Sequence, residues 1–150
     1  MINIQRVTEN DLESLAGLYK QFWNEKSSVE RMKAVFDRLK NNPDYLILVA
    51  KQHHRVIGSV MGIICQELYG DCKPFMVVED MIVDKLNRRK GAGTLLMRTV
   101  EQYAKKRECS YIILITEQDR TAAHGFYESL GFDGNVYRGF KKRLDEKPHA

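Results

Sequence analysis

Cysteine is scarce in this sequence, and long apolar runs are absent. The three cysteines, Cys65, Cys72 and Cys109, are an odd number that does not suit a disulfide framework, so we expect a reduced, cytosolic protein. No apolar run is long enough to cross a bilayer, and residues 1–6 do not resemble a secretion signal. These absences predict a cytoplasmic location and no membrane partner.

Several ligand-binding patterns are missing as well. Cys65 and Cys72, taken with His53 and His54, include no Cys-x-x-Cys pair, so we predict no metal site. The chain has neither the third glycine of a dinucleotide fingerprint nor the Gly-Lys-Ser/Thr ending of a P-loop. The net charge of +4 is modest and both signs are mixed along the chain, so no nucleic-acid partner is expected.

The sequence does have enough apolar residues for one ordinary domain. It has 150 residues, of which 43% are hydrophobic, and it shows neither a linker nor a repeat, so we predict a single domain over residues 1–150. Apolar spacing separates the expected strands from the expected helices. Strands are predicted over residues 2–7, 45–51, 56–65, 73–83 and 110–116, with a final hairpin over 132–144, and helices begin after Thr8, at Ser27 or Ser28, after Gly93 and near Ala122. The resulting order is βααβββαβαβ(β), a mixed α/β domain.

The most informative segment is a basic, glycine-containing turn between an expected strand and an expected helix. It reads Arg88-Arg89-Lys90-Gly91-Ala92-Gly93-Thr94. Two glycines two positions apart let the backbone turn tightly and leave its N–H groups uncovered, and a helix start adds further free N–H groups and the positive end of the helix dipole. Such a segment is a receptor for phosphate or diphosphate. A solvated basic turn capped by glycine is the other interpretation.

A second motif near the C-terminus makes a family resemblance visible. Arg88, Gly91 and Gly93 fit the Arg/Gln-x-x-Gly-x-Gly/Ala motif that follows the fourth strand of the GCN5-related N-acetyltransferases (GNAT). The run from Phe126-Tyr127 to Gly131-Phe132 resembles the late Phe-Tyr-x-x-x-Gly-Phe motif of the same family. With the matching order of elements, the resemblance implies a GNAT-like acyl-CoA N-acyltransferase fold, with splayed central strands and an acetyl-CoA site.

The resemblance also implies which residues bind acetyl-CoA. The diphosphate is expected at Arg88, Arg89, Lys90, Gly91, Ala92, Gly93 and Thr94, mostly through their main chain. The pantetheine arm is expected to pair with the main chain of Met81, Ile82 and Val83, as an added strand does. Many members of the family have Asn where this chain has Arg120, so the contact of that Asn is not transferred here.

Two residues are candidates for the chemistry of acetyl transfer. The resemblance places Tyr127 beside the coenzyme sulfur, where a phenol is a competent donor to the leaving thiolate. Glu79, or secondarily Asp80, is the candidate base or amine-orienting group, because a carboxylate in a long β-run usually has a task or a partner. Strand alternation predicts Glu79 and Met81 on one face and Asp80 and Ile82 on the other. The alternatives are that Tyr127 only packs in the core and that Glu79 only bonds neighbouring backbone.

The acceptor is expected where the first two helices meet the strands. Trp23, Glu25, Asp71 and Asp80 are the candidate contacts, and their acidic tendency favours a cationic amine of a small molecule or peptide. A non-catalytic acyl-CoA-binding sensor is the alternative function, because it needs the glycine turn but neither Tyr127 nor Glu79. A basic nucleic-acid binder is a third hypothesis. Members of the family are often dimers, so the resemblance leaves a homodimer open.

Overall fold

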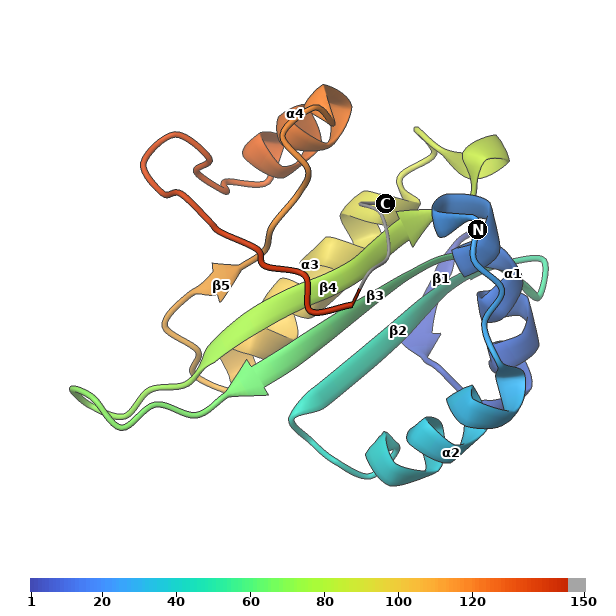
Figure 1. Cartoon of the computed structure of the whole chain (residues 1–150), viewed down its shortest axis with the longest axis horizontal. Helices are drawn as coiled ribbons and strands as arrows, with labels where there is room; N and C mark the ends of the chain where they lie inside the picture. The colour runs from blue at the N-terminus through green and yellow to red at the C-terminus, as the bar shows by residue number, and fades with distance from the viewer. Residues whose placement is uncertain (146–150) are drawn as a thin grey trace. The chain divides into compact units, whose positions relative to one another are not determined.

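The structure is a computed structural model that describes residues 1–145. It contains two compact units, residues 1–114 and the residues from 115 onward. The first unit is built on a five-stranded sheet with the strand order β1-β2-β3-β4-β5 (Figure 1). The pairs β1–β2, β2–β3 and β3–β4 are antiparallel, and the pair β4–β5 is parallel. The element order agrees with the prediction as far as the last helix.

The bounds of the elements follow the predicted segments closely, apart from β5 and the predicted final hairpin. The strands are β1 (Asn3–Arg6), β2 (Tyr45–Gln52), β3 (Arg55–Cys65), β4 (Phe75–Val83) and β5 (Ile112–Ile113). The helices are η1 (Glu9–Asp11), α1 (Leu12–Trp23), α2 (Val29–Leu39), η2 (Lys85–Asn87), α3 (Ala92–Lys106) and α4 (Thr121–Ser129). Among residues 1–145, no helix combines the length and apolar character that a membrane span requires.

Short polar side chains determine where the first helices begin. The Asp11 carboxylate accepts hydrogen bonds from the backbone N–H and the hydroxyl of Thr8, which fixes the turn into η1 and α1. The Ser28 hydroxyl accepts from the backbone N–H of Arg31 and so caps α2, as predicted. These bonds fix the start of η1 and α1 and the start of α2.

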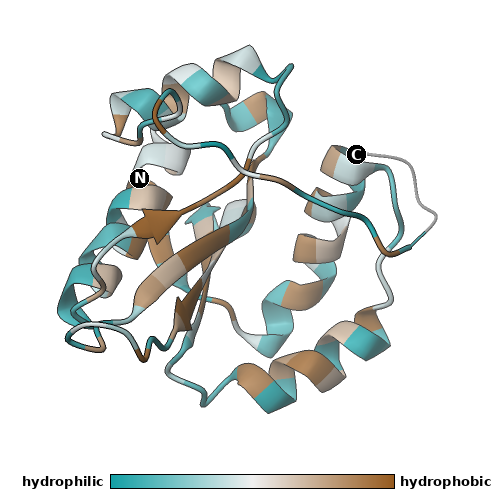
Figure 2. Ribbon diagram, turned by 60° about the vertical axis from the view of Figure 1, so that its left-hand side comes forward, coloured by the Kyte–Doolittle hydropathy of each residue, from teal (hydrophilic) through white to brown (hydrophobic). Residues whose placement is uncertain are grey.

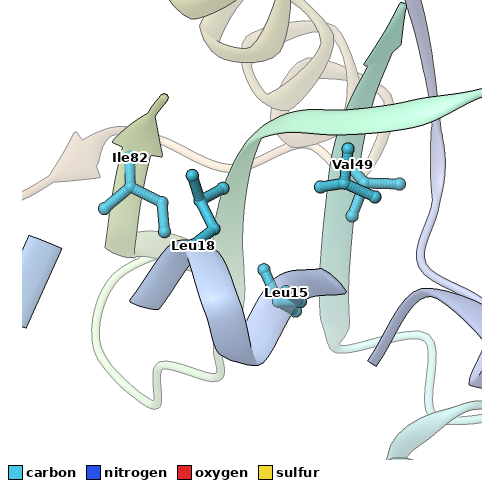
Figure 3. Packing of buried hydrophobic residues seen from close by; sticks show 5 residues of the cluster. Leu15, Leu18, Val49 and Ile82 are labelled. Atoms are coloured by element: carbon cyan, nitrogen blue, oxygen red, sulfur yellow. The ribbon is translucent and has the colours of Figure 1, made fainter. Parts of the chain in front are cut away.

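Helices α1 and α2 cover one face of the sheet. Leu15 and Leu18 of α1 point toward the strands that carry Val49 and Ile82 (Figure 3), and Met32 of α2 packs against the same cluster. Figure 2 shows the strands as mostly hydrophobic ribbons and the helices as alternating hydrophobic and hydrophilic ribbons, which is the pattern of amphipathic helices on a buried sheet. Ile82 therefore ties the end of β4 to α1.

Helix α3 covers the opposite face. Its buried residues are Ala92, Leu96, Met97, Val100 and Ala104. Gly58 of β3 lets α3 come close, because a Cβ at this position would stand 3.2 Å from the Leu96 side chain and 3.1 Å from the Ile82 carbonyl oxygen. Real Cβ atoms seldom have two such close neighbours. The start of α3 is thus positioned against the end of β4 by the missing side chain of one glycine.

The second unit contains α4 and an irregular segment after it. Gly131, with φ of +93°, follows the end of α4, as predicted. The hairpin predicted over residues 132–144 is wrong, since residues 130–145 form no strand. The Asp133 carboxylate instead accepts from the backbone N–H groups of Asn135 and Val136. This local turn competes with strand pairing for the same backbone donors.

Candidate active site

Strands β4 and β5 pair over only two residues and then diverge. β5 pairs only through Ile112 with Met76 and through Ile113 with Val77, at the start of β4. The predicted strand over residues 110–116 is therefore reduced to two residues. Within the first unit, β4 from Val78 to Val83 pairs with β3 but not with β5. This divergence agrees with the predicted splay of the central strands, and it leaves one edge of β4 available for an added strand-like ligand.

A β-bulge interrupts β4 at the carboxylate pair. Met61 of β3 pairs with Glu79 and Ser59 pairs with Ile82, so Asp80 and Met81 together face the single residue Val60. Asp80 has a φ of +54°, in the left-handed region that non-glycine residues rarely adopt. A bulge bends its strand and redirects its side chains, and bulges are common beside active sites.

The bulge overturns the predicted alternation along β4. Cross-strand partners point to the same side of a sheet. Ser59 and its partner Ile82 lie on the α1 face, so Met61 and its partner Glu79 lie there too. The prediction that Glu79 and Ile82 lie on opposite faces is wrong, because the extra residue in the bulge shifts the parity of the strand.

Asp80 lies close enough to Tyr19 of α1 for its charge to act on the phenol. Burial raises the pKa of the Tyr19 phenol well above its usual range, and the negative charge of Asp80 raises it further. A hydrogen bond with the buried Ser59 hydroxyl acts in the opposite direction. The Ser59 hydroxyl itself donates to the Leu48 carbonyl oxygen at 2.8 Å. Tyr19 therefore keeps its proton and is a neutral, partly buried group near Asp80.

The segment after β4 combines a short 3-10 helix with two left-handed residues. Arg89 has φ of +62° and Gly91 has φ of +92°, and α3 starts at the next residue, Ala92. Gly91 supplies the turn, whereas Gly93 lies within the first turn of α3. Within residues 1–145, no acceptor is bonded to the backbone N–H groups from Arg88 to Thr94. A row of free donors at a helix start is what a diphosphate needs.

The cations of this segment lie at the surface. Lys85, Arg88, Arg89 and Lys90 are all exposed. The Arg88 side chain folds back and donates from Nε to the Val83 carbonyl oxygen at 3.3 Å. Arg88 thus links the end of β4 to the turn, and the other cations remain on a solvent-accessible loop beside the free donors.

Tyr127 lies in α4 of the second unit, among aromatic neighbours. Its ring packs edge-on against Phe126 and Phe132, with centroids 5.1 Å and 5.8 Å away. Burial raises the pKa of the Tyr127 phenol, while the positive charge of Arg120 acts in the opposite direction. His124 is held by a 2.9 Å hydrogen bond between Nε2 and the Glu117 carbonyl oxygen. Tyr127 therefore remains protonated at neutral pH, as an acid must.

The candidate acceptor residues fall into two groups. The Trp23 ring packs at a tilt against the Tyr19 ring, with centroids 5.4 Å apart, and the charge of Asp80 acts on the Tyr19 phenol. Glu25 is exposed in the connection that follows α1. Asp71 lies in the β3–β4 loop, at the opposite end of β4 from the glycine turn (Figure 1). The first unit does not bring Asp71 to Asp80, so its role in acceptor binding stays a prediction.

The histidines and cysteines considered as metal ligands lie in different places along the β3 region. His53 and His54 lie in the turn before β3, whereas Cys65 ends β3 and Cys72 lies in the loop beyond it. Within residues 1–145, no three His, Cys, Asp or Glu side chains gather closely enough to hold a metal ion.

Sequence reasoning missed three residues that organise this region: Tyr19, Gln21 and Asp84. Tyr19 is predictable only as an apolar-face residue of a helix, because its relation to Asp80 depends on the bulge. Asp84 is buried, with 2% of its surface exposed, and its carboxylate accepts from Gln21 Nε2 at 3.0 Å. The available signal for Asp84 was an Asp directly after an apolar strand, a residue type that often caps a helix.

Two curated relatives match nearly the whole chain, and a family model matches most of it. The model described as "Acetyltransferase (GNAT) family" matches residues 12–132. The "Uncharacterized N-acetyltransferase YhfO" of Bacillus subtilis is 25% identical over 140 residues, covering 88% of this chain and 90% of the relative. The "Aminoglycoside N(6')-acetyltransferase type 1" of Acinetobacter haemolyticus is 24% identical over 148 residues, covering 96% of this chain and 100% of the relative.

Solved structures share the fold. A glucosamine-6-phosphate N-acetyltransferase from Arabidopsis thaliana superposes with a TM-score of 0.86 at 20% identity, covering 97% of this chain and 99% of the other. An aminoglycoside N-acetyltransferase, AAC(6')-Iy, in complex with CoA has a TM-score of 0.79 at 19% identity, covering 97% and 96% of the two chains.

Proposed function

The chain belongs to the GNAT family of acetyltransferases, and from this premise we propose that it moves an acetyl group directly from a thioester to a primary amine of a small molecule or peptide. It is an N-acetyltransferase, and its co-substrate is acetyl-CoA. The names of the relatives describe N-acetyltransferases, and the proposal adds direct transfer, the type of acceptor and the residues of this chain.

One observation carries the proposal for the coenzyme site. The edge of β4 that β5 leaves unpaired runs directly into the turn whose N–H groups have no bonded acceptor within residues 1–145. Met81, Ile82 and Val83 would pair with an extended amide-containing arm, and the turn from Arg88 to Thr94 would bind a diphosphate. When bound, acetyl-CoA supplies the activated acetyl group. The strand edge and the turn hold it in a fixed orientation.

The carboxylates at the bulge are the proposed bases. Glu79 is exposed on the α1 face, where it is open to a bulk water or to an amine. An ammonium group must lose a proton before it can attack a carbonyl carbon, and a carboxylate can accept that proton directly or through one water. We assign this role to Glu79. Asp80, which lies beside the protonated Tyr19, is the second candidate and is better suited to orient the amine.

Tyr127 is the proposed acid. Its role rests on the family resemblance and on the protonation state of its phenol. A thiolate leaving group gains a proton most easily from a donor that holds one at neutral pH, and the raised pKa of Tyr127 meets that condition. A bulge residue near Ile82 is the proposed backbone donor to the developing oxyanion.

The proposed acceptor is a cationic amine bound near Trp23, Glu25 and Asp80. The name of the Acinetobacter haemolyticus relative supports a small molecule rich in amino groups. Carboxylates near the bulge favour such a charge, since opposite charges attract across a partly desolvated surface. Asp71 is retained as a proposed contact for a longer acceptor.

The deciding experiment is an acetyl-CoA turnover screen over polyamines, aminoglycosides, amino acids and short peptides. The thiol of released coenzyme A is followed with a colorimetric reagent, and the mass of each product is measured by mass spectrometry. We expect a mass gain of one acetyl group on one class of amine. The double variant Gly91→Ala/Gly93→Ala serves as the control for turnover that does not depend on the turn.

A negative screen has to be read together with binding. If the wild type binds coenzyme A but acetylates nothing, the sensor function is favoured over transfer to these amines. If the wild type does not bind coenzyme A, the proposed coenzyme site is wrong.

A further inference from the structure

A buried carboxylate lies at the junction between β4 and the coenzyme turn. The Asp84 side chain is 3% exposed and faces Arg55, whose Nη2 lies 3.6 Å from Asp84 Oδ2. Asp84 Oδ1 accepts from Gln21 Nε2 at 3.0 Å, and Oδ2 accepts from Asn87 Nδ2 at 2.7 Å. The backbone N–H of Leu86 also points to Oδ1, at 3.5 Å. A buried charge is stable only with such partners, and these come from three separate segments.

Both the nitrogen and the oxygen of the Gln21 side-chain amide form hydrogen bonds. Its Nε2 donates to Asp84, and its Oε1 accepts from the backbone N–H of Lys85 at 2.9 Å. Gln21 lies in the last turn of α1, which ends at Trp23 and is followed by the connection that contains Glu25. Lys85 is the first residue of η2, which leads into the glycine turn. One side chain therefore fixes the coenzyme turn to the helix next to the acceptor region.

The hydrogen bonds of Asp84 fix the direction of η2 and therefore of the glycine turn that follows it. Asp84 caps η2, and its own backbone N–H donates to the Ile57 carbonyl oxygen at 2.8 Å. The backbone donors proposed to bind the diphosphate begin only a few residues later, at Arg88. A change in the direction of η2 would displace all of them together, and preorganised donors lose binding energy when they must be reordered.

We propose that Gln21 and Asp84 are positioning residues that hold the turn from Lys85 to Gly91 in its coenzyme-binding conformation, and so couple α1 to coenzyme affinity. The proposal rests on the coenzyme site of the proposed function. Neither side chain is among the residues proposed to bind the coenzyme. Gln21 is exposed at the surface, so its substitution leaves the core intact.

The test compares Gln21→Leu with Lys20→Leu, a replacement by leucine at the preceding exposed position of α1. Coenzyme A affinity is measured by calorimetry, thermal unfolding is measured without ligand, and KM for acetyl-CoA and kcat are measured on the amine found in the screen. We expect Gln21→Leu to weaken coenzyme A binding at least about fivefold, because two hydrogen bonds are lost. KM for acetyl-CoA should rise by a similar factor while kcat changes little. Lys20→Leu should match the wild type.

Asp84→Asn is the second variant. It keeps the volume of the side chain but presents an NH2 group to donors, so it should weaken coenzyme A binding at least as much as Gln21→Leu. If Gln21→Leu is folded and binds coenzyme A with wild-type affinity, the positioning role is wrong, even where its melting temperature falls. If the wild type itself does not bind coenzyme A, the proposed function fails instead.

Discussion

At the scale of single residues, the carboxylate pair in β4 has the greatest chemical consequence. An unbroken strand would separate Glu79 from Ile82 across the sheet. The bulge at Asp80 instead brings Glu79 and Ile82 to the face covered by α1. The charge of Asp80 also acts on the protonated phenol of Tyr19 in α1. The proposed base, Glu79, and the proposed orienting group, Asp80, both lie at this bulge.

The assignment of Glu79 as the base predicts a difference between the two carboxylates. Glu79→Gln should lower kcat on the order of 100-fold, since a positioned base contributes about 10²–10⁴-fold. Asp80→Asn should act mainly on KM for the amine, because Asp80 is assigned to orientation. Initial rates over pH 6 to 9 with the amine identified by mass measure both effects. Equal losses of kcat in the two variants would contradict the assignment.

Tyr127 gives a second prediction at this scale. Tyr127→Phe removes only the hydroxyl and retains the ring that packs on Phe126 and Phe132, so the melting temperature should change little. The loss of the acid should lower kcat about 10²-fold without a matching change in coenzyme A affinity. Tyr137→Phe, the same substitution at an exposed position in the same unit, is the control. Unchanged turnover in Tyr127→Phe would leave this residue with a packing role only.

At the scale of elements, the turn between β4 and α3 depends on one left-handed glycine. A Cβ at Gly91 would meet no atom within 4 Å, so the effect of Gly91→Ala comes from backbone conformation and not from a clash. With φ of +92°, alanine at this position should cost roughly 1–3 kcal/mol and distort the donors that follow. Coenzyme A affinity and chemical denaturation measure the two consequences.

A matched control for this prediction lies in α1. Gly17 also has open space around a Cβ, but it lies in the middle of a helix with an ordinary φ. Gly17→Ala should therefore stabilise the protein by roughly 0.5–1 kcal/mol. The same chemical change is thus expected to have opposite signs at the two positions. Stabilisation by Gly91→Ala would show that the turn is not strained in the way the backbone indicates.

At the scale of the whole molecule, two buried carboxylates set the response to acid. Burial acts to raise the pKa of Asp11, but the hydrogen bonds from Lys51 and Thr8 outweigh it, so the pKa lies below its usual value. The hydrogen bond from Gln21 does most to lower the pKa of Asp84, with burial opposing it. A folded pKa below the unfolded value of about 3.9 means that the unfolded chain binds more protons in acid.

The predicted pH dependence follows from that sign. The stabilisation from Asp11 and Asp84 is complete above about pH 4–5 and is lost as the pH falls through their folded values. Thermal unfolding followed from pH 7 to pH 2 should therefore show a plateau and then a steep decline. Asp11→Asn should be less stable at pH 7 and should decline less steeply in acid. An identical slope in both proteins would mean that Asp11 does not contribute to acid unfolding.

The sequence predicted the features that depend on local pattern. The glycine turn, the cap at Ser28, the helix end at Gly131 and the order of elements through α4 all follow from residue types at fixed spacing, and the structure and the family model agree with them. The bulge at Asp80 was not predictable, because it depends on how β4 pairs with β3. The short β5 and the missing final hairpin have the same origin, since strand length is decided by partners distant in the chain. The roles of Glu79, Tyr127, Trp23, Glu25 and Asp71 remain predictions.

Gly58 shows how an interior position can restrict adaptation of this enzyme. Its missing side chain lets Leu96 and the Ile82 carbonyl approach, and the helix that carries Leu96 also begins at the coenzyme turn. In a directed-evolution library, substitutions at Gly58 would therefore be lost in selections for activity even when the variants remain abundant in cells. Laboratory selection for new acceptors is better aimed at the connection after α1, where Asn24, Glu25 and Lys26 are exposed.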